Sequence, residues 1–177
     1  MFEQVLVAVD GSSTGKRGLE AAIGLAADQK ATLTILHVVD ATAGTAYVGD
    51  MGYIPANYID NLLDDLRTNG RKVLAAAEAA AAKAGVQAKT VLVETKGGSI
   101  ADAILGQARK LKSSVIVMGT HGRRGLRRVV MGSDAEAVVR EARVPVLLVR
   151  APEGRAPASR ARAPASPRRA SKGSRAT

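Results

Sequence analysis

The sequence predicts an α/β fold, in which a single doubly wound, five-stranded parallel sheet carries helices on both faces. First, short apolar runs alternate with segments of helical periodicity along residues 1–150. Second, these runs contain few polar residues, which is typical of strands buried on both sides of a parallel sheet. Third, most of the four connections between the runs are helical, so right-handed crossovers between parallel strands are expected.

Five strands are expected along the chain. The first is a wholly apolar run that ends at Asp10-Gly11. The last begins after Pro145, a residue that suits the start of an edge strand. The predicted strands span residues 5–9, 32–39, 90–94, 115–118 and 146–149.

Apolar residues recur at helical spacing between these strands. The predicted helices include residues 19–26, 58–84, 100–111 and 135–142. Gly85 is placed to end the longest of them, because glycine readily adopts the left-handed conformation that follows a helix. Ser99 followed by Asp102 resembles the start of a helix.

The composition excludes several classes of site. The chain has no cysteine, which rules out disulfides and thiolate zinc sites, and its two histidines are too few for a multi-His metal centre. No apolar run approaches the roughly 20 residues of a membrane span. The N-terminus carries an acid at position 3 and does not resemble a signal peptide, so we expect a cytoplasmic protein.

The positive charge is concentrated at the C-terminus. Residues 151–177 contain seven of the 26 Lys and Arg residues and a single acid, Glu153, in a sequence rich in Ala, Pro, Arg and Ser. Such a segment buries too little apolar surface to fold, so we expect a folded domain over residues 1–150 and a disordered basic tail over 151–177. The tail either increases solubility or holds nucleic acid and other anionic surfaces non-specifically.

Two predicted strand ends carry residues suited to ligand binding. One is Asp10-Gly11, and the other is Gly119-Thr120-His121-Gly122. In doubly wound sheets, ligands bind outside the carboxyl ends of the strands, where the winding reverses. These two strand ends are therefore the candidate site.

The segment from Met118 to Ser133 indicates an anion site. It leaves a strand through glycines and enters a helix at Gly132-Ser133, whose amides and dipole favour phosphate. Its four arginines add positive potential: Arg123, Arg124, Arg127 and Arg128. The alternative is purely structural, with a tight turn, a solvated basic loop, and a capping box formed by Ser133 and Glu136. The segment matches neither the P-loop nor the dinucleotide pattern.

Residues 1–150 resemble the ATP-binding subgroup of the universal stress proteins of the UspA type. The resemblance rests on Asp10-Gly11-Ser12, on Leu36-His37-Val38 and on the spacing Gly119-x2-Gly122-x9-Gly132-Ser133, which is the family's ATP-binding signature. It implies a Rossmann-like fold with strand order 3-2-1-4-5, which would bring Asp10 and Gly119 into one crevice. It also implies a homodimer. The last predicted strand is short, apolar and expected at the sheet edge, so we expect the two copies to pair through it.

The resemblance further implies an adenine-nucleotide site that holds ATP. Asp10 resembles an acid on the ribose or adenine side, and Val38 a residue whose backbone contacts adenine. Asp134 stands where the family usually has an uncharged residue, so it would either repel a phosphate or help to hold Mg²⁺. The implied nucleotide-binding residues are Ala8, Val9, Asp10, Val38, Met118, Gly119, His121, Gly122, Arg123, Gly132, Ser133 and Asp134. His37 is interpreted as a packing residue at a strand end.

Three functions are consistent with these features. The first is a non-catalytic ATP-binding module of a stress response or signalling pathway. The second is a weak ATPase or an autophosphorylating protein, with Ser133 among the acceptors. The third is association with nucleic acid through the tail. The first is favoured because hydrolysis needs a positioned base. Asp134 is the only carboxylate near the predicted phosphates, and it is equally well interpreted as an acid that stabilises the N-terminus of a helix.

Overall fold

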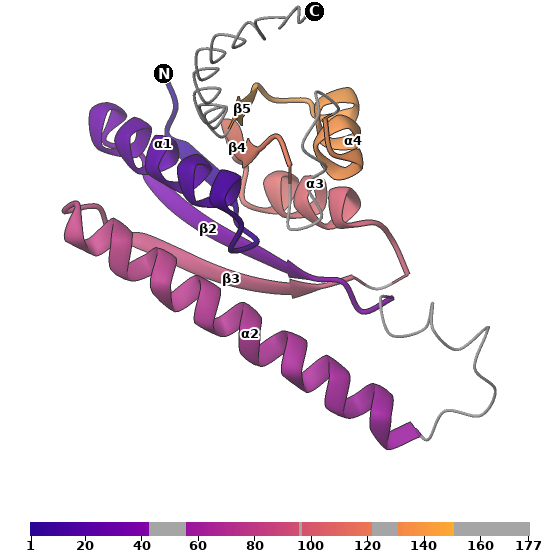
Figure 1. Ribbon diagram of the computed structural model, residues 1–177. Coiled ribbons are helices and arrows are strands. Elements are labelled where there is room, and N and C mark those ends of the chain that lie inside the picture. Colours follow the sequence, from indigo (N-terminus) through magenta and orange to yellow (C-terminus); the bar gives the residue numbers. More distant parts are fainter. Residues whose placement is uncertain (43–55, 96, 122–130, 151–177) are drawn as a thin grey trace, which may run out of the picture.

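The computed structural model describes residues 1–42, 56–95, 97–121 and 131–150. Strands and helices alternate throughout this part of the chain (Figure 1). The elements are β1 (Gln4–Ala8), α1 (Ser13–Gln29), β2 (Thr32–Val39), α2 (Ala56–Lys83), β3 (Ala88–Glu94), α3 (Ile100–Lys110), β4 (Val115–Gly119), α4 (Ser133–Glu141) and β5 (Val146–Val149). The strands form one parallel sheet in the order β3-β2-β1-β4-β5, which confirms the predicted fold class and strand order.

The sheet separates two apolar cores. Val5 and Val7 of β1 pack with α1 and α2 on one face, whereas Leu6 packs with α3 and α4 on the other. Successive residues of a strand point to opposite faces, so a strand covered on both faces must be apolar throughout. The helices change face between the β1–β3 half and the β4–β5 half, so the winding reverses between β1 and β4.

Local signals in the sequence explain the helix ends. The Ser12 hydroxyl accepts a hydrogen bond from the Gly15 amide at 3.0 Å and so caps the start of α1. Gly85 follows α2 at a φ of +76° and ends the helix as predicted. Its amide and the amide of the next residue donate hydrogen bonds to carbonyls in the last turn of the helix. The predicted start of α3 at Ser99 is also confirmed.

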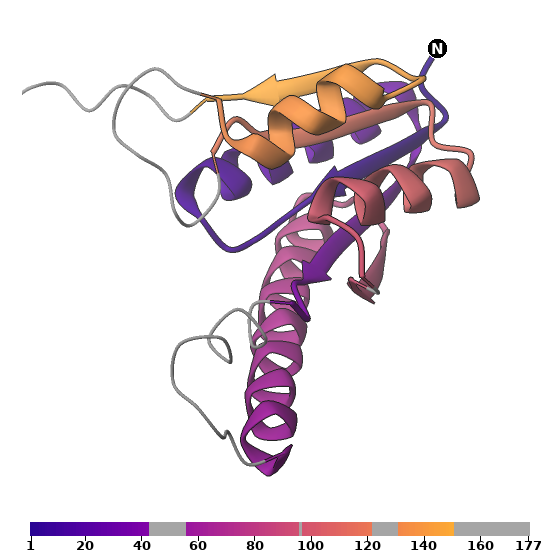
Figure 2. The same cartoon turned by 90° about the vertical axis from the view of Figure 1, so that its right-hand side faces the viewer.

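Helix α2 is the longest element and extends past the sheet (Figure 2). Its 28 residues give a helix of about 42 Å, whereas the eight residues of β2 span about 26 Å. Arg67 fixes α2 to β3: its Nε and Nη2 donate to the two carboxylate oxygens of Glu94 at 2.6 and 2.9 Å. These contacts, together with Asp64, raise the pKa of the Arg67 guanidinium above its ordinary value.

Strand β5 lies at one edge of the sheet, as Pro145 predicts, and its Leu147 is 41% exposed. The homodimer expected through this strand stays a prediction. Residues 151–177 lie outside the described residues, so the predicted tail and its binding of nucleic acid stay predictions as well. In the part of the chain that the structure describes, no helix combines the length and the apolar character that crossing a membrane requires.

Candidate functional site

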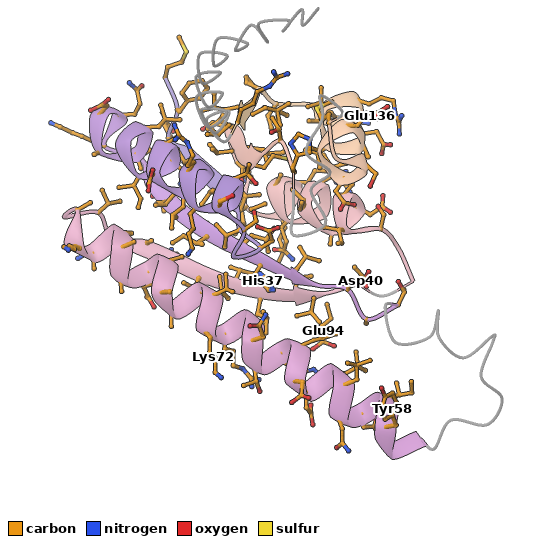
Figure 3. All side chains as sticks on the ribbon, viewed as in Figure 1. His37, Asp40, Tyr58, Lys72, Glu94 and Glu136 are labelled. Atoms are coloured by element: carbon orange, nitrogen blue, oxygen red, sulfur yellow. The ribbon has the colours of Figure 1, made fainter. Side chains whose placement is uncertain are left out.

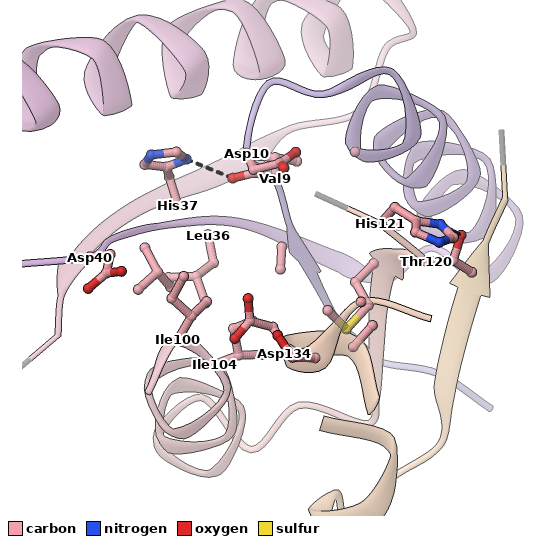
Figure 4. Close-up of a pocket in the computed structure, with 18 of the residues that line it drawn as sticks. Val9, Asp10, Leu36, His37, Asp40, Ile100, Ile104, Thr120, His121 and Asp134 are labelled. Carbon is pink, nitrogen blue, oxygen red and sulfur yellow. Dashed lines mark hydrogen bonds between the residues drawn. The ribbon is translucent and has the colours of Figure 1, made fainter. Parts of the chain in front are cut away.

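A cavity of about 550 Å³ lies at the carboxyl ends of β1 and β4 (Figure 4). Its volume falls within the range of roughly 300–1,000 Å³ that is usual for small-molecule sites. The wall is built from the ends of β1, β2 and β4, the first turns of α3 and α4, and one side of α2. The cavity therefore lies where the winding of the sheet reverses, as the sequence predicted.

The cavity brings together almost all of the predicted binding residues. Its wall contains Ala8, Val9, Asp10, Val38, Met118, Gly119, His121, Gly132, Ser133 and Asp134. The two others, Gly122 and Arg123, lie outside the described residues. The predicted juxtaposition of Asp10 with Gly119 in one crevice is confirmed as geometry, while the binding role of each residue stays a prediction.

Asp10 is held in a fixed orientation beside the cavity. Its Oδ1 accepts hydrogen bonds from the Ser12 amide at 2.9 Å and from the Ser12 hydroxyl at 2.6 Å. Gly11 takes a φ of +82°, which a residue with a side chain rarely adopts, and turns the chain from β1 into α1. Asp10 therefore stabilises the turn between β1 and α1, and it also lines the cavity.

The end of β4 contacts the start of α1. The Thr14 hydroxyl donates a hydrogen bond to the His121 carbonyl. A Cβ on Gly119 would lie 2.9 Å from both the carbonyl carbon and the Cβ of Thr14. The absence of a side chain at Gly119 therefore lets the helix approach the strand, whereas the sequence suggested that glycines here serve the approach of a ligand.

Helix α4 begins at the wall of the cavity. Gly132 is its N-cap, and among the described residues no side-chain hydrogen bond caps the start of the helix. The predicted capping box of Ser133 and Glu136 is wrong, because Ser133 is already the first helical residue and Glu136 donates its amide to the Gly132 carbonyl as in any helix. Residues 132–135 line the cavity, so the positive end of the helix dipole faces it.

The described part of the wall is acidic. It carries three carboxylates, of Asp10, Asp40 and Asp134, together with two histidines and no Lys or Arg. Among the described residues, no group of three His, Cys, Asp or Glu side chains is arranged to hold a metal ion.

Several lining residues were not predicted from the sequence. Asp40 follows β2, Leu66 and Asn69 come from α2, and Ile100 and Ile104 form an apolar pair on α3. The spacing of Ile100 and Ile104 marked them as one face of a helix, but only the packing of that helix shows that the face meets the cavity. Leu66 and Asn69 depend in the same way on where α2 lies.

The backbone of Val38 also faces the cavity. The Val9 amide donates to the Leu36 carbonyl at 2.9 Å, so Leu36 and every second residue of β2 direct their amide and carbonyl toward β1. Val38 belongs to this set, but β1 pairs with β2 only up to Ala8.

His37 is buried and its Nδ1 lies 2.7 Å from the Val9 oxygen, which confirms the structural position expected for it.

Solved structures with the same fold include complexes with adenine nucleotides. A universal stress protein family member from Burkholderia pseudomallei is 35% identical, with a TM-score of 0.64 over 82% of this chain and 95% of that one. The universal stress protein of Archaeoglobus fulgidus in complex with dAMP has a TM-score of 0.59 at 22% identity, over 83% of this chain and 97% of that one. A universal stress protein in complex with cAMP has the same TM-score at 24% identity, over 84% and 97%.

The sequence comparisons agree with the structural ones. The universal stress protein YxiE of Bacillus subtilis is 38% identical over 151 residues, which cover 85% of this chain and 100% of that protein. The family model described as "Universal stress protein family" matches residues 1–150, the same part of the chain that carries the sheet and the cavity. The chain therefore belongs to the universal stress protein family.

Proposed function

We propose that the cavity binds an adenine nucleotide, with ATP as the expected ligand, and that the protein acts as a non-catalytic, nucleotide-responsive module of a stress response. One observation carries the proposal: a single cavity joins the backbone edge of Val38 to the first turn of α4. The complexes of related proteins with dAMP and cAMP support the choice of adenine.

The Val38 side of the cavity suits the base. The Val38 amide is a donor and its carbonyl an acceptor on the same side of the strand, and adenine presents an acceptor nitrogen beside an amino group. Leu36, Ile100 and Ile104 give this region apolar walls for the ring. Asp10, held by Ser12, is placed to accept a hydroxyl hydrogen of the ribose.

The α4 side of the cavity suits the phosphates. The amides at the start of a helix carry partial positive charge and bind anions. At α4 the N-cap is Gly132, which has no side chain to cap them. Ser133 adds a hydroxyl. Gly122 and Arg123 are expected to add an amide and a cation, while Asp134 opposes the phosphates unless Mg²⁺ lies between them.

The first experiment is to denature the purified protein and identify any released nucleotide by chromatography. Calorimetry with ATP, ADP and AMP, each with and without Mg²⁺, then gives the affinities. Gly132→Val should weaken ATP binding at least tenfold, because its side chain would stand beside Thr120 and His121 of the cavity wall. Gly106→Ala is the matched control, since a Cβ there meets nothing within 4 Å. No released nucleotide and no heat at millimolar ATP would reject the proposal.

Weak ATP hydrolysis is a second candidate, because Asp134 lines the cavity at the first turn of α4. A general base there would require Asp134 to activate a water beside the terminal phosphate. Steady phosphate release that disappears in Asp134→Ala would favour hydrolysis. Under the proposed function, release stays at the background of a protein-free control, and Asp134→Ala changes only the affinity and its dependence on Mg²⁺.

A further inference from the structure

We propose that His37 is a positioning residue for base recognition. Its imidazole donates a hydrogen bond to the Val9 carbonyl, which would otherwise be the next acceptor in the pairing of β1 with β2. The pairing therefore ends there, and the Val38 backbone stays open to a base. The inference rests on the proposed adenine site and deepens it, because it identifies what makes the recognising edge available.

The regular pairing of the two strands shows which bond the imidazole replaces. β1 and β2 pair from Gln4 with Thr32 to Ala8 with Leu36, and the last bond runs from the Val9 amide to the Leu36 carbonyl. In a continued parallel ladder, the next bond would run from the Val38 amide to the Val9 carbonyl. The pairing ends before that bond, and the Val9 oxygen lies 2.7 Å from the His37 Nδ1.

The surroundings fix the imidazole in this role. A carbonyl oxygen only accepts, so Nδ1 must carry the hydrogen. The residue is 6% exposed, and its ring lies between the sheet and α2 (Figure 3). Gly70 of α2 makes room for it, because a Cβ at that position would lie 2.7 Å from the His37 Cδ2 and 3.2 Å from Nε2. The close-up shows the ring directed at Val9 beside the cavity (Figure 4).

The consequence is a donor and an acceptor side by side on one cavity edge. β1 turns away at Asp10-Gly11, while β2 continues to Val39 along β3. The Val38 amide matches the ring acceptor of adenine, and the Val38 carbonyl matches its amino group. Guanine presents an N–H and a carbonyl at these two places, so both contacts would become repulsive. A site that hydrogen-bonds its ligand in this way discriminates strongly against a mismatched one.

Two substitutions separate positioning from packing. His37→Leu removes the donor but keeps an apolar side chain of moderate size in the buried position. The Val9 carbonyl would then lack a partner, and pairing with the Val38 amide is the nearest way to satisfy it. His37→Asn keeps an N–H donor close to the place of Nδ1, so we expect it to preserve the open edge.

The first test uses the ligand-free protein and amide hydrogen exchange measured by NMR. We expect Val38 to exchange at least tenfold faster than Leu36, whose amide lies inside the β1–β2 ladder. His37→Leu should slow Val38 exchange at least tenfold, whereas His37→Asn should leave it fast. A slow Val38 amide in the unchanged protein, or no change in His37→Leu, would overturn the proposal. If His37→Leu does not fold, the unchanged protein and His37→Asn still decide it.

The second test compares binding of AMP, GMP and inorganic tripolyphosphate. His37→Leu should reduce the preference for AMP over GMP at least tenfold while tripolyphosphate binding stays within twofold. His37→Asn should keep the preference. Equal losses for all three ligands would mean that His37 only stabilises the fold, which contradicts positioning. If the unchanged protein binds no nucleotide, the proposed function fails, but the exchange experiment still tests the hydrogen-bond geometry by itself.

Discussion

At the scale of single residues, two glycines set the distance between α1 and β4. A Cβ on Gly119 would lie 2.9 Å from the carbonyl carbon of Thr14 and 3.1 Å from the Gly15 nitrogen. A Cβ on Gly18 would meet the backbone of Met118 and Gly119 at 3.4 Å. Backbone atoms cannot rotate away as a side chain does, so a larger residue at Gly119 must move the helix or the strand.

Gly119→Ala is therefore expected to lower the free energy of unfolding by about 1–3 kcal/mol, the usual cost of overpacking. Urea unfolding measures this change. Gly24→Ala in α1 is the control, because a Cβ there meets nothing within 4 Å. An alanine in an exposed helix should raise the free energy of unfolding by about 0.5–1 kcal/mol. Changes of the same sign in both variants would contradict the close approach of α1 to β4.

At the scale of elements, α3 and α4 begin in opposite ways. The Ser99 hydroxyl accepts the Asp102 amide at 3.0 Å, and the Asp102 carboxylate accepts the Ser99 amide at 2.9 Å. The Ser99 hydroxyl also donates to the Asp102 carboxylate, at 2.8 Å. The two bonds that this carboxylate accepts, first from the Ser99 amide and then from the Ser99 hydroxyl, lower the pKa of Asp102 below its ordinary value of 3.8. Helix α4 starts at Gly132 with no such bonds. The start of α3 is capped by its own side chains, whereas the start of α4 has no cap among the described residues and lies at the cavity.

Ser99→Ala should lower the free energy of unfolding by about 0.5–2 kcal/mol at pH 7, as for other N-cap residues. Ser133→Ala is the matched control and should change it by less than about 0.5 kcal/mol, since Ser133 makes no cap.

The same contact predicts a pH dependence. Because the pKa of Asp102 is lowered by folding, its contribution to stability is present above pH 3.8 and is lost as the pH falls through the lower folded value. In Ser99→Ala the pKa should move back toward 3.8, because the bond from the hydroxyl is gone, and the acid loss should shrink. An NMR titration of the Asp102 carboxyl checks this, and an unchanged pKa would contradict the bond from the hydroxyl.

At the scale of the whole molecule, the cavity joins two parts of the chain. β1, β2 and α2 supply one side of its wall, and α3, β4 and α4 supply the other. A ligand that fits between them binds the folded state only. Binding must therefore raise the stability of the whole domain by mass action.

ATP at 100 times its dissociation constant should raise the free energy of unfolding by about 2.7 kcal/mol. For a domain of this size that corresponds to a rise in Tm of roughly 5–10 °C. Scanning calorimetry with ATP and with GTP, each with Mg²⁺, measures the shift, and Gly132→Val should show a smaller one. An equal rise with both nucleotides would contradict recognition of adenine.

How much was predictable from the sequence depends on how local each signal is. The apolar runs of β1 and β4 predicted both strands, because burial on two faces leaves no polar positions. The start of β3 was placed two residues late, since Ala88 and Lys89 lie on an edge strand and form no apolar run. The strand order came from the family resemblance and not from periodicity, which does not specify which strands are neighbours.

The candidate site was predicted where it follows strand ends, and missed where it depends on packing. Asp10 lies two residues after the end of β1 and Gly119 ends β4, so their place in the crevice follows from topology. Asn69 lies in the middle of a long helix, and nothing near it in the sequence indicates the cavity. The capping-box pattern failed at Ser133 because the pattern is the same whether that serine precedes the helix or begins it.

The reversal between β1 and β4 has a mechanical consequence. The chain up to β3 forms one part of the domain, and the chain from α3 onward forms the other. The two parts are joined by the pairing of β1 with β4. Helix α1 also contacts β4 and β5, and α3 contacts β2. A molecule bound at the carboxyl ends of β1 and β4 would contact both parts and hold them together. If the backbone is cleaved between β3 and α3, we expect the proposed nucleotide to strengthen the reassociation of the two fragments, so that the pair could serve as a split reporter for nucleotide binding.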